Sequence, residues 1–287
     1  MKRQPVIVVG GYSLDCGPMA TLNTLSVSTL SEFADVANGF AVSPKQTAWF
    51  RGVGSASHTL TPSVYRHPSI TDVKALVELE FDLYNRFRQR SIPFQTRPLN
   101  TEWEHLFFMQ HYGVPTRLLD WSENSMVALY FAIASAEERR DPVTHAFTSD
   151  AAVWFLNPQV WNEHALGAGW KDRVLDVHDS LMTAYRPTSD LKSLQTKPVA
   201  MSGLHNSSRI VAQRGAFVIF GSDSRPMETI YGDPAFPDDT LVRVLIPQGA
   251  IATVQDQLFK LGYSDSMVYP DLVGLTKELR RQFGFPY

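Results

Sequence analysis

Apolar residues recur along the chain with two different periods, and each period predicts one kind of secondary structure. Alternation over residues 47–53 (TAWFRGV) predicts a strand with Phe50 and Arg51 on opposite faces. Short apolar runs predict further strands at 6–9, 115–122, 151–158, 209–221, 240–247 and 250–254. Three- and four-residue spacing predicts helices at 31–39, 71–89, 101–113, 126–134 and 270–283.

Two of these helices carry sequence signals at their ends. Thr101 and Glu104 have the spacing of a capping box, and Gly113 suits the left-handed residue that ends a helix. We expect Ser122 to cap the helix that contains residues 126–134, which is apolar on every side. A helix of that kind is expected at the centre of the fold.

The order of the predicted elements favours an α+β fold over regular βαβ winding, because groups of strands and helices alternate with irregular connections. The glycines at 10–17 (GGYSLDCG) lack the spacing of a dinucleotide-binding turn, and no helix pattern follows them. We expect residues 1–40 to form an N-terminal extension packed on a single domain over residues 41–287.

Composition narrows the class of protein. With 44% hydrophobic and 19% charged residues, the chain has ordinary globular composition. A net charge of −3 and a pI near 6.2 argue against binding to nucleic acid through bulk charge. The single Cys16 excludes an internal disulfide, and the longest apolar run, 126–134, is about half of what a bilayer requires. We therefore expect a cytoplasmic protein with no membrane partner.

Candidate chemistry is concentrated in two stretches, residues 48–54 (AWFRGVG) and 108–132 (FMQHYGVPTRLLDWSENSMVALYFA). Both place polar groups among apolar residues, where such groups need hydrogen-bonding partners or a ligand. The chain has no paired metal-ligand spacing, no nucleophile elbow and no P-loop, so we expect no metal.

Five segments in order resemble the FRG domain family, which is named after a Phe-Arg-Gly motif. They are WFRG at 49–52, LTPSVYR at 60–66, the run at 110–132, AVWFLNP at 152–158 and RIVAQRGAF at 209–217. The signature region of this resemblance therefore spans residues 49–217.

The same segments resemble one clade of ADP-ribosyltransferases, in which an arginine, a serine and a glutamate mark successive strands. WFRG is similar to the first element and LLDWSENSMVALYFA to the second, but Gln213 stands where the glutamate is expected. This resemblance implies split, mainly antiparallel sheets flanked by helices, with NAD as the substrate.

The resemblance also implies roles for individual residues. Arg51 is expected to clamp a pyrophosphate, and Gly52 to let the backbone approach the ligand. Asp120 is expected to stabilise positive charge on the sugar. The residues alone also allow Arg51 to be a structural partner of Asp120, and allow Asp120 to hold Arg117 or to cap the following helix.

Further residues complete the predicted site. His111 is a candidate general base, and Gln213 a candidate partner of a ribose hydroxyl. The expected substrate contacts are Tyr65, as part of a roof, with Gln110, Arg117, Ser122 and Arg209. Helix-end capping is the alternative role for Gln110 and His111, as bonding to a neighbouring loop is for Gln213.

The implied function is NAD-dependent ADP-ribosyl transfer to a macromolecular acceptor, by a toxin or antiviral defence effector with an inhibitory, antitoxin-like partner. Two other functions remain open at this level. One is NAD hydrolysis, with water as the acceptor. The other is a non-catalytic nucleotide-sensing or interaction module, which the absence of the glutamate favours.

Overall fold

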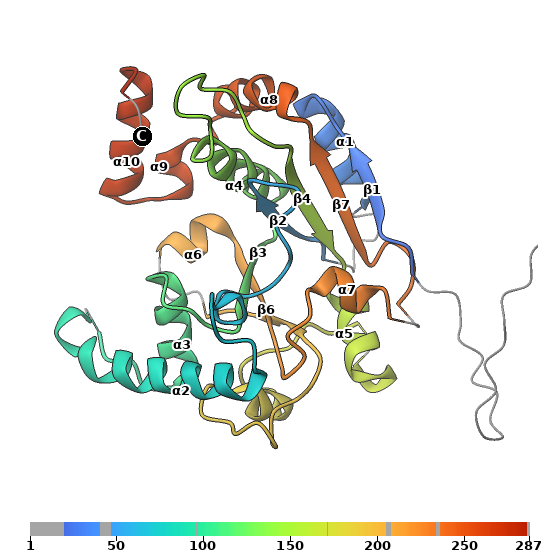
Figure 1. Ribbon diagram of the computed structural model, residues 1–287, viewed down its shortest axis with the longest axis vertical. Coiled ribbons are helices and arrows are strands. Elements are labelled where there is room, and N and C mark those ends of the chain that lie inside the picture. Colours follow the sequence, from blue (N-terminus) through green and yellow to red (C-terminus); the bar gives the residue numbers. More distant parts are fainter. Residues whose placement is uncertain are drawn as a thin grey trace, which may run out of the picture.

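The computed structural model describes residues 20–40, 47–95, 97–170, 172–204, 208–233 and 236–285 (Figure 1). Over these ranges, seven strands form one mixed sheet in the order β1-β7-β4-β2-β3-β6-β5. The strands are β1 Asn23–Ser26, β2 Trp49–Val53, β3 Leu118–Ser122, β4 Ala151–Leu156, β5 Val199–Ser202, β6 Gly215–Ile219 and β7 Leu241–Ile246. The strand predicted at 6–9 lies outside the described residues.

Helices flank the sheet on both faces. They are α1 Leu30–Phe40, α2 Val73–Arg90, α3 Glu102–His111, α4 Ser125–Glu137, α5 Pro158–Leu166, α6 Ser208–Gln213, α7 Met227–Tyr231, α8 Gln248–Lys260, α9 Asp265–Val268 and α10 Leu272–Gln282. Short 3₁₀ turns are η1 Ser63–Arg66, η2 Ile92–Phe94, η3 Ala168–Trp170 and η4 Ser180–Tyr185. The described helices include none that is both long and apolar enough to cross a membrane.

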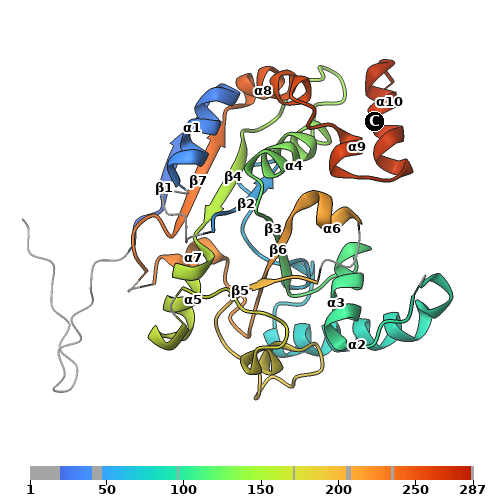
Figure 2. The same cartoon turned by 180° about the vertical axis from the view of Figure 1, so that it is seen from behind.

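The sheet divides between β2 and β3. The described residues of these two strands pair at one position, Phe50 opposite Ser122, whereas β2 and β4 pair along the whole of β2. One half, β1-β7-β4-β2, is antiparallel apart from the parallel pair β1 and β7, and the other, β3-β6-β5, is antiparallel throughout. Figures 1 and 2 show α1, α4 and α8 beside the first half, and α2 and α3 near the second.

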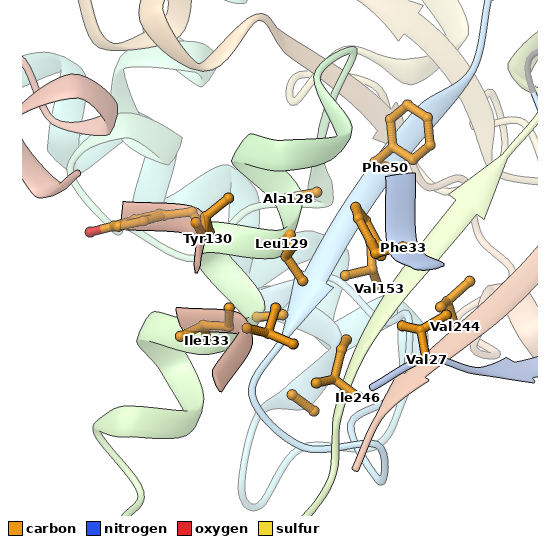
Figure 3. Packing of buried hydrophobic residues seen from close by; sticks show 14 of the residues in the cluster. Val27, Phe33, Phe50, Ala128, Leu129, Tyr130, Ile133, Val153, Val244 and Ile246 are labelled. Carbon is orange, nitrogen blue, oxygen red and sulfur yellow. The ribbon is translucent and has the colours of Figure 1, made fainter. Parts of the chain in front are cut away.

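Alternation in β2 places its residues in two different cores. Phe50 packs in the core between the sheet and helices α1, α4 and α8, where the centroid of its ring lies 4.8 Å from that of Phe155. Figure 3 shows Phe50 with other residues of this core. Trp49 and Val53 belong to the core on the opposite face. The predicted division of this strand is thus confirmed, and Arg51 lies on the same side as Trp49 and Val53.

Helix α4 is central, as its composition predicts. Its buried residues, which include Ala128, Leu129, Ala132 and Ile133, pack against β2 and β4 in the largest core. A third core lies under α3, where Leu106 and Phe107 are buried with residues of β5 and β6. Residues of β2 or β3, the two strands at the division of the sheet, therefore contribute to all three cores.

Most of the predicted elements are present, and the fold is α+β. The capping box of Thr101 and Glu104 forms, and Gly113 takes a left-handed conformation with φ of 77°. One predicted strand is wrong, and the strand predicted at 209–221 is wrong only in its first part, because residues 215–219 form β6. Residues 209–213 belong to α6, which ends before Arg214 at φ 46°, and residues 250–254 belong to α8.

Both errors have the same physical cause, since short apolar runs do not distinguish strands from helices. In α8, Ile251, Val254 and Leu258 recur at three- and four-residue spacing and bury one face against the sheet. In α6, Ile210 is the buried residue, and its side chain packs against Gly215.

Residues 20–40 contribute directly to the sheet and its core. Strand β1 extends the edge of the sheet by pairing with β7, and Phe33 of α1 is fully buried against Phe155. The division into an extension over 1–40 and a domain over 41–287 stays a prediction.

Candidate functional site

A cavity of about 270 Å³ lies where the sheet divides. Its walls come from β2, α3, β3, α4, α6 and β6, which are separate in sequence and meet at this point. Phe50, Phe131 and Phe217 form apolar parts of the wall. Its polar lining includes Arg51, His111, Asp120, Arg209 and Gln213. Because concave sites with a few converging polar groups typically bind small molecules, this cavity is the candidate site.

Arg51 reaches from β2 to the neighbouring strand β3. Its Nη1 donates a hydrogen bond to the backbone carbonyl of Asp120 at 2.5 Å and lies 4.0 Å from Oδ2 of the same residue. Its Nε is buried and has no hydrogen-bond partner among the described residues. Burial lowers the pKa of the guanidinium from its ordinary value, and the charge of Asp120 opposes that shift. A buried donor without a partner is costly, and an anionic ligand would satisfy it.

Asp120 is held by a relay of hydrogen bonds from α3. The hydroxyl of Thr116 donates to Oε1 of Gln110 at 2.6 Å, which fixes the amide so that Nε2 donates to Oδ2 of Asp120 at 2.9 Å. The Asp120 side chain is 56% exposed, so its carboxylate faces the open side of the cavity. The predicted contact of Gln110 with a substrate is therefore not its main role here, because its amide is engaged with Asp120 and Thr116.

Gly52 is a glycine because of helix packing. A Cβ at this position would lie 1.9 Å from the carbonyl oxygen of Ala128, and one at Gly54 would lie 2.4 Å from the backbone of Ser135. These two glycines let β2 lie directly against α4, and Gly52 also lines the cavity. The expected reason, close approach to a ligand, is not needed to explain this residue.

Ser122 does not cap α4, although its position in the sequence predicts that it does. The cap is Asn124, whose side chain accepts hydrogen bonds from the backbone of Met126 and Val127. The Ser122 hydroxyl instead donates to the backbone carbonyl of Gln213 at 2.6 Å and accepts from the backbone of Asn124 at 3.0 Å. Ser122 thus joins β3 to the end of α6 and positions the cavity wall.

Gln213 lines the cavity, but its amide is shared with the C-terminal helices. Its Nε2 donates to the backbone carbonyl of Val268 at the end of α9, at 3.1 Å. Arg209, one turn earlier on α6, stacks over the ring of Tyr269 at 4.4 Å. The wall formed by α6 is therefore supported by α9 and the residue that follows it.

His111 lies at the end of α3, beside Arg209 and facing Asp271. Burial and the positive charge of Arg209 lower the pKa of its imidazole, and Asp271 opposes them. The ring is therefore neutral at pH 7 and able to accept a proton. The structure brings this predicted base into the same cavity as Arg51 and Asp120.

Two predicted contacts lie outside the cavity. Arg117 is fully buried, and its Nε and backbone nitrogen both donate to the carboxylate of Glu80 while its remaining donors reach backbone carbonyls. Its guanidinium is thus fully used in structural contacts. The hydroxyl of Tyr65 donates to the carbonyl of Gly221 at 2.5 Å, and its ring packs on Phe220. Neither residue is placed to contact a ligand in the cavity.

Sequence reasoning missed several residues that shape the site. Thr116 orients Gln110, Asn124 caps α4, and Phe131 and Ser135 line the cavity from α4. The last two had a readable signal, because they face the same side of the helix at four-residue spacing. The described residues contain no cluster of three metal-ligating side chains.

Comparison with known proteins gives one finding. Residues 46–141 match the family model of the FRG domain. This range contains β2, α3 and β3, which supply Arg51, His111 and Asp120, and it also contains α4. Neither the curated proteins nor the solved structures yield a match.

Proposed function

The chain contains an FRG domain at residues 46–141, and from this premise and the geometry of the cavity we propose that it binds NAD there and transfers ADP-ribose to a macromolecule. The observation that carries the proposal is Arg51, with a buried, unpartnered Nε beside an exposed carboxylate. Arginine binds phosphate oxygens through its planar fork, and the cavity leaves part of that fork free.

In the proposed reaction the bond between C1′ of the nicotinamide ribose and the pyridinium nitrogen breaks. Its electron pair goes to nicotinamide, which leaves as a neutral molecule, and an acceptor nucleophile forms a new bond to C1′. Positive charge develops on the sugar as the bond breaks, and the carboxylate of Asp120 stabilises it. The hydrogen bond from Gln110 keeps that carboxylate in position.

The acceptor loses a proton in this reaction, and His111 is the group that takes it up. Its imidazole is neutral at pH 7 because burial and Arg209 lower its pKa. Water as the acceptor would make the same site an NAD hydrolase. The cellular role, a toxin or antiviral effector with an inhibitory partner, stays a prediction.

A second candidate function is a nucleotide-binding module without turnover. The observation that favours it is Gln213, because an amide stands where the resemblance predicts a carboxylate and donates to Val268. An amide cannot accept a proton as a carboxylate does. The same ligand would then bind without bond cleavage.

The test is incubation of the purified full chain with NAD labelled in its adenylate, with and without a cell lysate. We expect nicotinamide release and transfer of label to a macromolecule, identified by its sensitivity to protease or nuclease. Arg51→Lys should remove both, whereas Arg86→Gln, on the exposed side of α2, should change neither. Release without transfer indicates hydrolysis, binding without release supports the module, and absence of binding contradicts the proposal.

A further inference from the structure

The cavity is too small for the whole of the proposed substrate. Ligand sites for drug-sized molecules usually hold about 300–1,000 Å³, and this cavity holds about 270 Å³. A dinucleotide is larger than such molecules, so part of it must extend beyond the cavity on its open side. The question is which surface receives that part.

Two exposed arginines, Arg66 and Arg139, lie outside the cavity lining, and their charges act together with that of Arg51 on the imidazole of His58. Arg66 ends the 3₁₀ turn η1, and its charge lowers the pKa of Arg51. Arg139 follows the end of α4, one turn beyond Ser135, which lines the cavity. The packing of Gly54 on Ser135 brings the end of β2 to the same place. The charges of all three arginines therefore act on His58, which lies shortly beyond the end of β2.

His58 holds Arg139 in this arrangement. Nη1 of Arg139 lies 2.9 Å from Nε2 of His58, and because arginine has only donors, the histidine must accept and must be neutral. Burial, followed by the charges of Arg139, Arg66 and Arg51, lowers the pKa of His58 and keeps it in that form. All three charges that act on this imidazole are positive.

These arginines have no opposing carboxylates of their own. Among the described residues, no salt bridge involves Arg66 or Arg139, and Asp120 is the partner of Arg51 alone. Arg97 and Arg173 are exposed arginines that do pair, with Glu104 and Asp179. Among the described residues Arg86 and Arg90 of α2 also form no salt bridge, but Arg66 and Arg139 differ from them in that their charges act on the same imidazole as that of Arg51. A group of neighbouring cations without counter-charges repels itself and is stabilised by an anion.

We propose that Arg66 and Arg139, with His58 orienting the latter, form a phosphate-binding strip that receives the adenosine diphosphate half of the dinucleotide. Arg51 lies between the cavity and this strip and contacts the pyrophosphate, while the nicotinamide riboside occupies the cavity. This inference rests on the proposed function, since it assigns the two halves of the same substrate to two surfaces.

The phosphates of a nucleic-acid acceptor are a different occupant of the strip. The net charge of −3 and the presence of only Arg66 and Arg139 in the proposed strip disfavour it, because binding to a nucleic-acid backbone needs many neutralising contacts. In the proposal the strip continues from Arg51, which contacts the pyrophosphate of the substrate. The phosphates of the substrate itself are therefore the favoured occupant of the strip. A single-stranded RNA probe separates the two occupants in the test.

The experiment is isothermal titration calorimetry of the full chain with ADP-ribose and with nicotinamide. We compare the wild type with Arg66→Gln, Arg139→Gln and the double variant. The double substitution should weaken ADP-ribose binding about tenfold through loss of charge-assisted contacts and leave nicotinamide binding unchanged. The matched control is Arg86→Gln with Arg90→Gln on exposed positions of α2, which should bind both ligands as the wild type does. Added salt should weaken ADP-ribose binding less in the double variant than in the wild type.

The outcomes separate the inference from the proposed function. If ADP-ribose binds the double variant as tightly as the wild type, the strip is wrong while NAD binding stands. Loss of RNA binding with unchanged ADP-ribose binding would overturn it in favour of a nucleic-acid acceptor. If the wild type binds neither NAD nor ADP-ribose, the proposed function falls, and the inference falls with it. Because both residues are exposed, circular dichroism should show each variant folded.

Discussion

Arg51 lies on β2 and Arg117 directly precedes the neighbouring strand β3, yet the two arginines have opposite surroundings. Arg117, just before β3, is fully buried, and Glu80 and backbone carbonyls satisfy its donors. Arg51, on β2, faces a cavity and has a buried Nε that finds no partner in the part of the chain that the structure describes. An arginine whose side-chain nitrogens are all hydrogen-bonded within the protein stabilises the fold, whereas one with a donor that lacks a partner is available to a ligand.

The largest expected effect concerns Arg117, which the protein itself hydrogen-bonds. Replacing Glu80 by Ala should lower the free energy of unfolding by about 3–5 kcal/mol, because the charge of Arg117 stays buried without its partner. Urea denaturation measures this change. Glu78→Ala is the control on the same helix, where the ion pair with Lys74 is exposed, and it should cost less than about 0.5 kcal/mol. Equal losses in both variants would remove the contrast between the two arginines.

Substitution of Arg51 should lower the rate of NAD consumption and leave the free energy of unfolding almost unchanged. Arg51→Lys should reduce NAD consumption about 100-fold, since lysine lacks the planar fork and its Nε donor. The unfolding free energy should change by less than about 1 kcal/mol, because lysine keeps the positive charge beside Asp120 and the lost Nε donor has no partner among the described residues. Nicotinamide release and urea denaturation on one preparation test both statements. A loss of stability matching that of Glu80→Ala would make Arg51 a structural residue.

A smaller effect is expected at the relay beside Arg51. Gln110→Leu keeps the side chain's size but removes the donor to Asp120, and should lower the rate of nicotinamide release about tenfold. The affinity for nicotinamide itself should not change, because Gln110 acts through Asp120. Gln110→Glu should be worse than Gln110→Leu, as it places like charges together. Unchanged rates in both variants would show that the relay has no functional role.

The smallest expected effect is a shallow dependence on pH. In the folded protein the pKa of His111 lies below its ordinary value of about 6.5, so more than half of the molecules have a neutral His111 ring at pH 6.5. Nicotinamide release should therefore fall by less than about twofold between pH 7.5 and 6.5, and fall further only as pH drops through the lowered pKa. In His111→Gln this acid limb should disappear. Its persistence in that variant would assign the limb to another group.

Much of the local structure was predictable because its causes lie within a few residues. The capping box of Thr101 and Glu104 forms between positions three apart. The alternation that separates Phe50 from Arg51 is a property of any extended chain. The membership of both Arg51 and Asp120 in one site was also predictable, since the resemblance to a known family covers both segments.

The partners of the polar residues were not predictable in the same way. The residues alone allowed Asp120 to hold Arg117, yet that arginine binds Glu80, 37 positions earlier in the chain. Gln110 binds Asp120, and Gln213 binds Val268, 55 positions later. Each of these pairings depends on which helices the fold places side by side. Several carboxylates and carbonyls could accept a hydrogen bond from each donor, and the distances set by the fold determine which one does.

The sequence by itself determined the chemistry that this chain can offer: an arginine on a strand, a carboxylate after a turn, and a histidine at a helix end. The tertiary structure decided which of those groups remain unsatisfied. Local periodicity reports which side of an element a residue occupies, but it carries no information about what lies opposite. The sheet divides between β2 and β3, and a cavity lies beside Arg51 at this division. Arg117 is enclosed instead, because Glu80 packs against it. The candidate site is therefore a product of long-range packing acting on residues whose types were already visible in the sequence.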